Sequence, residues 1–385
     1  MATVPVPRWS AVVAVMVGIF AIVTTEILPV GLLTGIGGSF DVSDGRAGLM
    51  MAVPGVLAAC AAPGVTVLTG RLDRRVMLCA FMALLAAANL IAACATSFPV
   101  MLASRVMVGV VIGGFWSIAA GVAARLVPER ERARATAFVF AGVPLGSVLG
   151  VPLGTLLGDL AGWRTAFAVM GVVSVLVCAA LAATVPRLPA GTATRAAVLL
   201  RTLRARPTRA ALTVTFLVVL AHFGTYTYVT PFLEGVTGVG AGTVTALLLL
   251  YGAAGVAGNF AGGAAVARWP RAAFGIAAAG IGGVALLLPL VGRGLVGAAV
   301  LLLLWGAAYG AVPVCSQNWF SRGAGGAPEA AGVLFTAAFQ ATFALGAFAG
   351  GLVLDRTSLT TVLVCGGGVA CLAAASVRAV GRVSP

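Results

Sequence analysis

Long apolar segments recur along the whole chain and are separated by short polar breaks. Each segment can form a helix of about 20 residues, the length that crosses a bilayer. The breaks at 69–75 and 267–271 are so short that neighbouring helices must be antiparallel. The pattern predicts an all-α polytopic membrane protein with twelve spans, near residues 11–33, 45–68, 76–96, 98–124, 134–158, 164–185, 210–232, 242–266, 272–291, 295–318, 330–353 and 360–380.

The composition agrees with this pattern. Hydrophobic residues make up 61% of the chain and charged residues only 9%, whereas a soluble domain carries about 25% charged residues. So few charges cannot cover a surface that faces water, and lipid must therefore solvate the protein. The 52 glycines favour close packing of helices within a bilayer.

All 24 basic residues are arginines, and their positions predict the orientation of the chain. If the N-terminus is cytoplasmic, only Arg46, Arg164, Arg293 and Arg356 face outside, and Arg105 lies within a span. The other 19 arginines then face the cytoplasm. Because arginines are retained on the cytoplasmic side, both termini should be cytoplasmic. The scattered arginines favour contacts with anionic lipid headgroups over nucleic acid.

One long polar linker divides the chain. Residues 186–209 contain six arginines among prolines and threonines. The linker separates an N-terminal half, residues 1–185, from a C-terminal half, residues 210–385, each with six predicted spans. Transporters built from two such halves bind substrate between them. Two glycine pairs at an offset of 200 residues indicate an internal duplication: Gly146 and Gly150, and Gly346 and Gly350.

The cysteines and the N-terminal segment exclude several other classes. All seven cysteines lie in apolar segments without a CxxC pair, and His222 is the only histidine. We therefore expect neither a metal site nor a disulfide framework. The apolar run after Arg8 continues through Glu26 without a small-residue cleavage site, so we expect a retained first span, not a signal peptide.

Three ionisable residues lie within predicted spans and away from the span ends: Glu26, Arg105 and His222. Such residues are costly in hydrocarbon and are functional candidates. At about 1.5 Å per residue, Glu26 and Arg105 lie at a similar depth and could pair if spans one and four are adjacent. A carboxyl group in a partly dry cavity holds its proton tightly, whereas a nearby arginine favours the ionised form. This contact could switch proton affinity or be a static ion pair.

His222 lies near the middle of span seven. Imidazole titrates near neutral pH, which suits proton transfer. The alternative is a ring that hydrogen-bonds substrate or another helix.

Span five has a glycine at every fourth residue and two prolines. Glycines at this spacing form a smooth stripe on which another helix can pack closely, and proline removes a backbone hydrogen bond and kinks the helix. We expect either a seam that opens and closes during transport or plain tight packing. The gating candidates in this span are Gly142, Pro144, Gly146, Gly150, Pro152 and Gly154.

Three stretches resemble the major facilitator superfamily, in its twelve-span drug:proton antiporter branch, and most of all the arabinose-efflux-type permeases. Residues 25–33, which include Glu26 and Pro29, resemble the acidic first-span motif. Arg105 followed by Gly109 and Gly113 resembles the fourth-span motif. The run from Gly142 to Phe167 resembles the antiporter motif of span five and the turn after it.

The loop between spans two and three departs from the family pattern. Asp73 and Arg74 match it, but Thr69 replaces the first glycine and the later glycine is absent. The resemblance implies that Asp73 and Arg74 take part in gating. An ordinary positive-inside anchor is the alternative.

The resemblance implies two six-helix bundles that export a small molecule in exchange for protons by alternating access. Glu26 would carry the proton, with Arg105 and His222 as further candidates for coupling. Aromatic and amide groups beside one acid suit a drug-like, neutral or cationic amphipathic compound, although each aromatic ring could equally face lipid or pack between helices. The substrate-binding candidates are Phe115, Trp116, Phe138, Tyr226, Tyr251, Trp305, Tyr309, Phe339 and Gln340.

A sugar or nucleoside exporter with the same cycle is the main alternative, and an importer is a second. A membrane-embedded enzyme fits less well, because the spans contain no pair of carboxylates, no HExxH and no Ser/His/Asp set. A receptor also fits less well, because it would normally have a soluble domain, and none is expected here. We expect no enzymatic activity, no cofactor and no nucleic acid partner. The partners would be substrate, protons and lipid, and the protein a monomer in the bacterial inner membrane.

Overall fold

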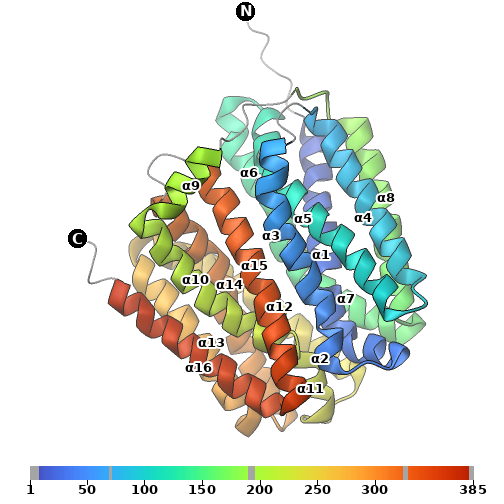
Figure 1. Ribbon diagram of the computed structural model, residues 1–385, viewed down its shortest axis with the longest axis vertical. Helices are drawn as coiled ribbons and strands as arrows, with labels where there is room; N and C mark the ends of the chain where they lie inside the picture. The colour runs from blue at the N-terminus through green and yellow to red at the C-terminus, as the bar shows by residue number, and fades with distance from the viewer. Residues whose placement is uncertain (1–7, 69–71, 190–195, 324–327, 381–385) are drawn as a thin grey trace, which may run out of the picture.

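A computed structural model describes residues 8–68, 72–189, 196–323 and 328–380. These ranges are almost entirely helical and contain no strand. Twelve of their helical segments are long and apolar enough to cross a membrane. The prediction of an all-α polytopic protein with twelve spans is confirmed (Figure 1).

The first six spans are α1 (Trp9–Phe40), α2 with α3 (Asp44–Ala47 and Leu49–Leu68), α4 (Arg74–Ala93), α5 (Phe98–Arg125), α6 with α7 (Arg132–Phe140 and Gly142–Ala161) and α8 (Trp163–Thr184). The last six are α10 with α11 (Arg206–Tyr226 and Val229–Gly235), α12 (Ala241–Arg268), α13 (Pro270–Val291), α14 (Leu295–Gly323), α15 (Pro328–Arg356) and α16 (Leu359–Val380). Two short helices, η1 (Glu129–Glu131) and α9 (Ala196–Arg204), lie in connections.

Three predicted spans are interrupted, at Gly48, at Ala141 and at residues 227–228. The second break lies just before Pro144, which has no N–H to donate to the carbonyl of Phe140 four residues earlier. α9 and the first turn of α10 lie inside the segment predicted as a polar linker.

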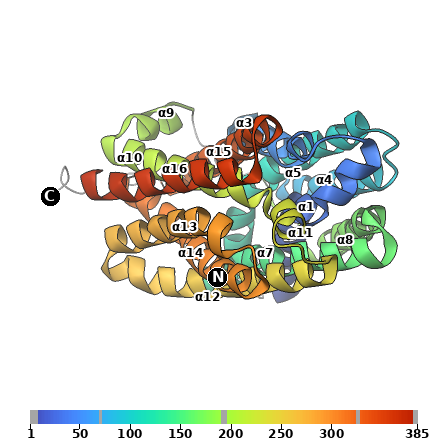
Figure 2. The same cartoon turned by 90° about the horizontal axis from the view of Figure 1, so that it is seen from below.

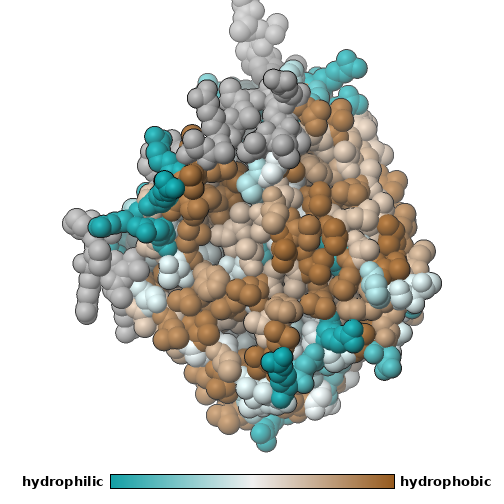
Figure 3. All heavy atoms as spheres, in the orientation of Figure 1, coloured by the Kyte–Doolittle hydropathy of each residue, from teal (hydrophilic) through white to brown (hydrophobic). Residues whose placement is uncertain are grey.

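The helices alternate in direction between two faces of the bundle. We call the face where α1 begins the terminal face, and the face with the loops at 41–43, 94–97 and 236–240 the distal face. Apolar side chains cover the middle of the surface between the two faces, and most hydrophilic side chains lie toward its edges (Figure 3). This belt is the surface expected to contact lipid.

The first six spans and the last six lie side by side when the molecule is viewed from the distal face (Figure 2). Within the first six spans, α1 packs against α7 and α3 against α5. Within the last six, α10 packs against α15 and α12 against α14. The two halves meet through α3 with α15, α7 with α12 and α1 with α11.

The two glycine pairs make equivalent contacts in the two halves. Gly146, on α7, packs against Val23 of α1. Gly346, on α15, packs against the main chain of Leu220 and Gly224 on α10. The first and seventh spans therefore have glycine-rich partners in matching places, as an internal duplication would produce.

Candidate functional site

Glu26 lies in the middle of α1 and is only 8% exposed. Its carboxylate Oε1 accepts a hydrogen bond of 2.8 Å from Nε2 of Gln340, on α15. The main chain of Gln340 packs closely on Gly55 of α3. The amide Oε1 of Gln340 is buried and has no partner among the described residues. A polar bond therefore joins the two halves at the one deeply placed carboxylate predicted from the sequence.

Arg105 lies on α5 and is completely buried. Its Nη2 donates to the main-chain carbonyls of Thr25 and Glu26, at 3.0 and 3.1 Å, and its Nε donates to that of Met50 at 3.0 Å. α1 and α5 are adjacent, which was the condition for pairing. However, no ion pair joins the side chains of Arg105 and Glu26, both of which belong to the described residues.

Asn89 is a buried polar residue that sequence reasoning missed. It lies on α4, is 1% exposed, and donates from Nδ2 to Oγ1 of Thr25 at 3.1 Å. A lone amide inside the predicted span 76–96 was the available signal, because an amide is costly in lipid. Asn89 and Arg105 together hold the turn of α1 that carries Glu26.

His222 is completely buried on α10 among aromatic rings. Nε1 of Trp305 donates to Nδ1 of His222 at 3.1 Å, and the hydroxyl of Tyr251 lies 3.4 Å from Nε2. Indole N–H is only a donor, so Nδ1 must present a lone pair. The imidazole is therefore neutral and carries its proton on Nε2, in position to bond to Tyr251.

The rings around His222 form one continuous group. Tyr309 stacks on the imidazole with 3.5 Å between ring centroids, and Tyr226 stacks at 5.1 Å. Phe223 links this stack to Phe339, at 6.1 Å. We call the set the aromatic cluster: His222, Phe223, Tyr226, Tyr251, Trp305 and Tyr309. The structure thus brings together the aromatic substrate candidates of the last six spans.

The three substrate candidates of the first six spans pack elsewhere. Phe115 is fully buried, with its ring against Gly18 of α1. Trp116 packs on Phe140, with 5.6 Å between ring centroids. Phe138 is 40% exposed and makes an edge contact with Trp9 at 6.1 Å. These contacts lie within the first half and are separate from the aromatic cluster.

Asp73 and Arg74 lie where α4 begins. Oδ1 of Asp73 accepts a 2.8 Å hydrogen bond from the main-chain N–H of Arg75, which caps the helix. The main-chain N–H of Arg74 donates to the carbonyl of Leu188, beyond α8. The rest of the predicted loop motif, Thr69 to Arg71, lies outside the described residues.

The glycine stripe of span five faces α1 within the same half. Gly150 packs on the main chain of Thr24, and Gly154 packs on Leu28. The contact with the other half is made by a different part of α7, where the main chain of Val148 packs on Gly252 of α12. The stripe therefore fixes how closely α7 approaches the helix that carries Glu26.

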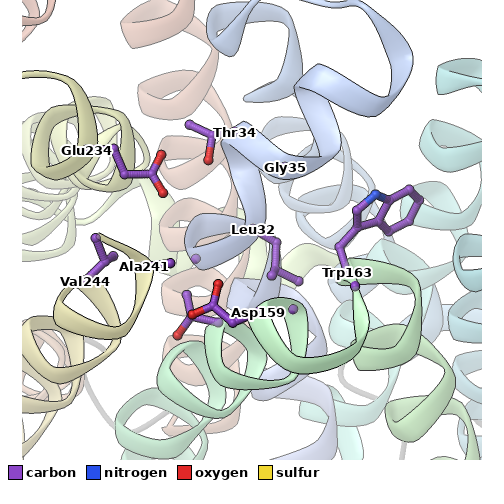
Figure 4. A pocket seen from close by; sticks show the side chains of 12 residues that line it. Leu32, Thr34, Gly35, Asp159, Trp163, Glu234, Ala241 and Val244 are labelled. Carbon is purple, nitrogen blue, oxygen red and sulfur yellow. The ribbon is translucent and has the colours of Figure 1, made fainter. Parts of the chain in front are cut away.

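The two halves also meet toward the distal face. Oγ1 of Thr230, on α11, donates to the carbonyl of Val30 at 2.9 Å. Nearby, a cavity of about 200 Å³ contains one carboxylate from each half, Asp159 and Glu234 (Figure 4). It is lined by Gly31, Leu32, Thr34, Gly35, Thr155, Gly158, Asp159, Gly162, Trp163, Glu234, Ala241 and Val244. Sequence reasoning placed neither carboxylate in the candidate site.

Two solved structures share the fold. A bacterial homolog of the human lysosomal transporter Spinster, in an inward-facing and unoccupied conformation, matches with a TM-score of 0.77 at 16% identity and covers 97% of each chain. The human organic anion transporter MFSD10 matches with a TM-score of 0.70 at 18% identity, over 97% of this chain and all of that chain.

Two relatives match by sequence over most of their lengths. The purine ribonucleoside efflux pump NepI of Salmonella paratyphi B is 31% identical over 379 residues, 98% of this chain and 96% of that protein. The transcription regulatory protein OpdE of Pseudomonas aeruginosa is 34% identical over 353 residues, 91% of this chain and 88% of that protein. Residues 14–337 match the sequence profile of the Major Facilitator Superfamily. The chain therefore belongs to the Major Facilitator Superfamily and is a membrane transporter, not an enzyme.

Proposed function

We propose that this transporter exports a purine ribonucleoside, or a similar flat and polar compound, in exchange for protons by alternating access. The observation that carries the proposal is the hydrogen bond between Glu26 and Gln340, which joins the two halves at a buried carboxylate. A group in this place can respond both to a proton and to the separation of the halves.

The chemistry of this pair supports proton exchange. In the described conformation Nε2 of Gln340 donates to Oε1 of Glu26, a bond that the ionised carboxylate accepts. Protonated Glu26 becomes a donor, and the amide Oε1 of Gln340 is a buried acceptor with no partner among the described residues. The pair can therefore be satisfied in either protonation state after the amide turns. Arg105 and His222 serve this site as positioning groups, since the described side chain of each is bonded to groups other than the carboxylate.

Two features support a nucleoside as the substrate. The relative NepI is a purine ribonucleoside efflux pump and aligns over 98% of this chain. Tyr309, a member of the aromatic cluster, and Phe339, which contacts Phe223, are half-buried and could offer aromatic faces to a flat base. Glu26 and Gln340 offer hydrogen bonds to the polar edges. A drug-like amphipathic compound is the second candidate, because the same aromatic faces can bind apolar rings without hydrogen bonds to polar groups at the ring edges.

The arginine distribution supports an inner-membrane orientation with both termini in the cytoplasm. The distal face is then external. The contacts of Thr230 with Val30 and of Gly48 with Tyr228 lie toward that face. We propose that the described conformation is closed on the outside, and that a monomer carries out the whole cycle.

Uptake into inverted vesicles tests the proposal. With an acidic interior, radiolabelled inosine or adenosine should accumulate, and a protonophore should abolish accumulation; vesicles without the protein give the background. Accumulation of an amphipathic cation but of neither nucleoside would refute the substrate class. Accumulation that survives the protonophore would refute proton coupling.

A further inference from the structure

Arg105 donates to main-chain carbonyls in two different helices, and a proline follows two of those carbonyls at the same spacing. In an α-helix, the N–H of each residue donates to the carbonyl four residues earlier. A proline at the fourth position has no N–H and leaves that carbonyl without its helical partner. Such a carbonyl, buried in hydrocarbon, must find another donor.

The first of these carbonyls lies in α1. Pro29 lies inside the helix, so the carbonyl of Thr25 lacks its helical donor. Nη2 of Arg105 donates to this oxygen at 3.0 Å and to the next carbonyl, of Glu26, at 3.1 Å.

The second carbonyl lies in α3. Pro54 lies inside that helix, so the carbonyl of Met50 lacks its helical donor. Nε of Arg105 donates to this oxygen at 3.0 Å. One side chain on α5 thus replaces the hydrogen bonds that two prolines remove from two neighbouring helices.

The fourth-span motif explains how Arg105 reaches α3. Gly109 follows Arg105 by four residues and Gly113 by eight, so all three lie on one face of α5. A Cβ at Gly109 would lie 2.9 Å from Cα of Pro54, and one at Gly113 would lie 2.6 Å from the carbonyl oxygen of Ala58. The glycines therefore bring α5 so close to α3 that the planar guanidinium spans from α3 to α1.

The geometry points to Arg105 as a positioning residue that closes the proline gaps of α1 and α3 and thereby holds Glu26 toward Gln340. It acts through the main chain of Glu26 and not by pairing with its carboxylate. This inference rests on the proposed role of Glu26 as the proton carrier. An electrostatic role of Arg105 would not depend on Pro29 and Pro54. The positioning role does, because Arg105 is needed only where these prolines leave carbonyls without donors.

A mutant cycle tests this dependence. Arg105→Met leaves two buried carbonyls without donors and should lower both thermal stability in detergent and proton-driven uptake, the latter by about tenfold or more. Pro29→Ala with Pro54→Ala restores the missing N–H groups. In that background, Arg105→Met should change uptake by less than about threefold and leave the pH profile of uptake unmoved.

Two control variants separate geometry from charge. Pro63 is another proline of α3, and it leaves the carbonyl of Ala59 without its helical donor. Arg105 makes its described bonds to other carbonyls. Pro63→Ala combined with Arg105→Met should therefore restore neither stability nor uptake. Arg105→Lys keeps the charge but lacks the planar fork that spans both helices, so it should fail like Arg105→Met.

Three results would overturn the inference: full uptake by Arg105→Lys, a folded triple variant no more active than Arg105→Met, or a triple variant with a shifted pH profile. If Arg105→Met yields no folded protein, recovery of folded protein in the triple variant supports the inference and continued failure overturns it. Thermal stability needs no substrate, so this readout stands even if the wild type transports no nucleoside.

Discussion

At the scale of single residues, the contacts of His222 favour a fixed neutral ring. The donor-only indole of Trp305 occupies Nδ1, and Tyr309 stacks on one face of the imidazole. Protonating Nδ1 would place two donors against each other in a buried site. The ring therefore sets the positions of Trp305 and Tyr309, and we assign it no share in carrying protons.

Substitution of His222 tests this assignment. His222→Asn keeps an acceptor near Nδ1, so it should keep proton-driven uptake and its pH dependence, with a weaker substrate affinity. His222→Phe leaves the buried N–H of Trp305 without an acceptor and should lower stability by about 1–3 kcal/mol. Uptake across pH and thermal unfolding in detergent measure both effects. Loss of proton coupling in His222→Asn at unchanged substrate affinity would contradict the assignment.

Glu26, Arg105 and Gln340 could each be selected from the sequence, because polar groups in hydrocarbon are costly. Their pairing could not. Gln340 lies 314 residues from Glu26 and on the other half, so no local periodicity connects them. In place of a side-chain contact with Glu26, which the sequence allowed, Arg105 bonds to the carbonyls of Thr25, Glu26 and Met50. Prolines leave the carbonyls of Thr25 and Met50 without helical donors.

At the scale of helices, the glycine stripe of α7 sets its distance from α1. A Cβ at Gly146 would lie 2.9 Å from Cβ of Val23, and one at Gly150 would lie 3.0 Å from Cα of Thr24. A larger side chain must push α1 away, and α1 carries Glu26 two residues after Thr24. Close packing of α7 on α1 therefore also sets the position of Glu26.

Gly146→Leu and Gly150→Leu should each insert in the membrane but lose most transport, with overpacking that lowers stability by about 1–3 kcal/mol. Gly283→Leu is the matched control, because a Cβ at Gly283 of α13 meets nothing within 4 Å. Yield of monodisperse protein and uptake in vesicles measure the two effects. Normal uptake by both stripe variants would show that α1 and α7 need not pack closely.

The hydrophobic pattern was sufficient to predict the number and type of the helices but not the breaks within them. Ala141 separates α6 from α7 three residues before Pro144. The missing N–H of this proline explains the break once its position is known. The break between Tyr226 and Val229 has the same kind of signal, since Pro231 has no N–H to donate to the carbonyl of Thr227 four residues earlier. The helix α9 also escaped prediction, since nine residues among arginines and prolines read as a polar linker.

At the scale of the whole molecule, contacts from both halves converge on the distal face. Tyr228 packs on Gly48, and Asp355 packs on Gly45, in addition to the bond from Thr230 to Val30. Closure at one face is what alternating access requires of each end state. The sequence predicted two halves, but the face at which they meet depends on packing between distant segments.

The orientation of these faces can be tested by labelling with a membrane-impermeant maleimide in a cysteine-free background. Ser43→Cys, in an exposed distal loop, should react in intact cells. Arg201→Cys, on exposed α9, should react only after permeabilisation. The reason is the retention of arginines on the cytoplasmic side. Reaction of Arg201→Cys in intact cells would reverse the proposed orientation.

The central claim is that proton and substrate compete through Glu26, and substrate affinity measured across pH tests it most directly. Purine ribonucleoside binding to the wild type should weaken as the pH falls through the pKa of Glu26, approaching about tenfold per pH unit for one competing proton. Glu26→Gln keeps size and hydrogen bonding but cannot titrate, so its affinity should stay constant and its proton-driven accumulation should vanish. An unchanged pH dependence in Glu26→Gln, or accumulation at the wild-type rate, would contradict the claim.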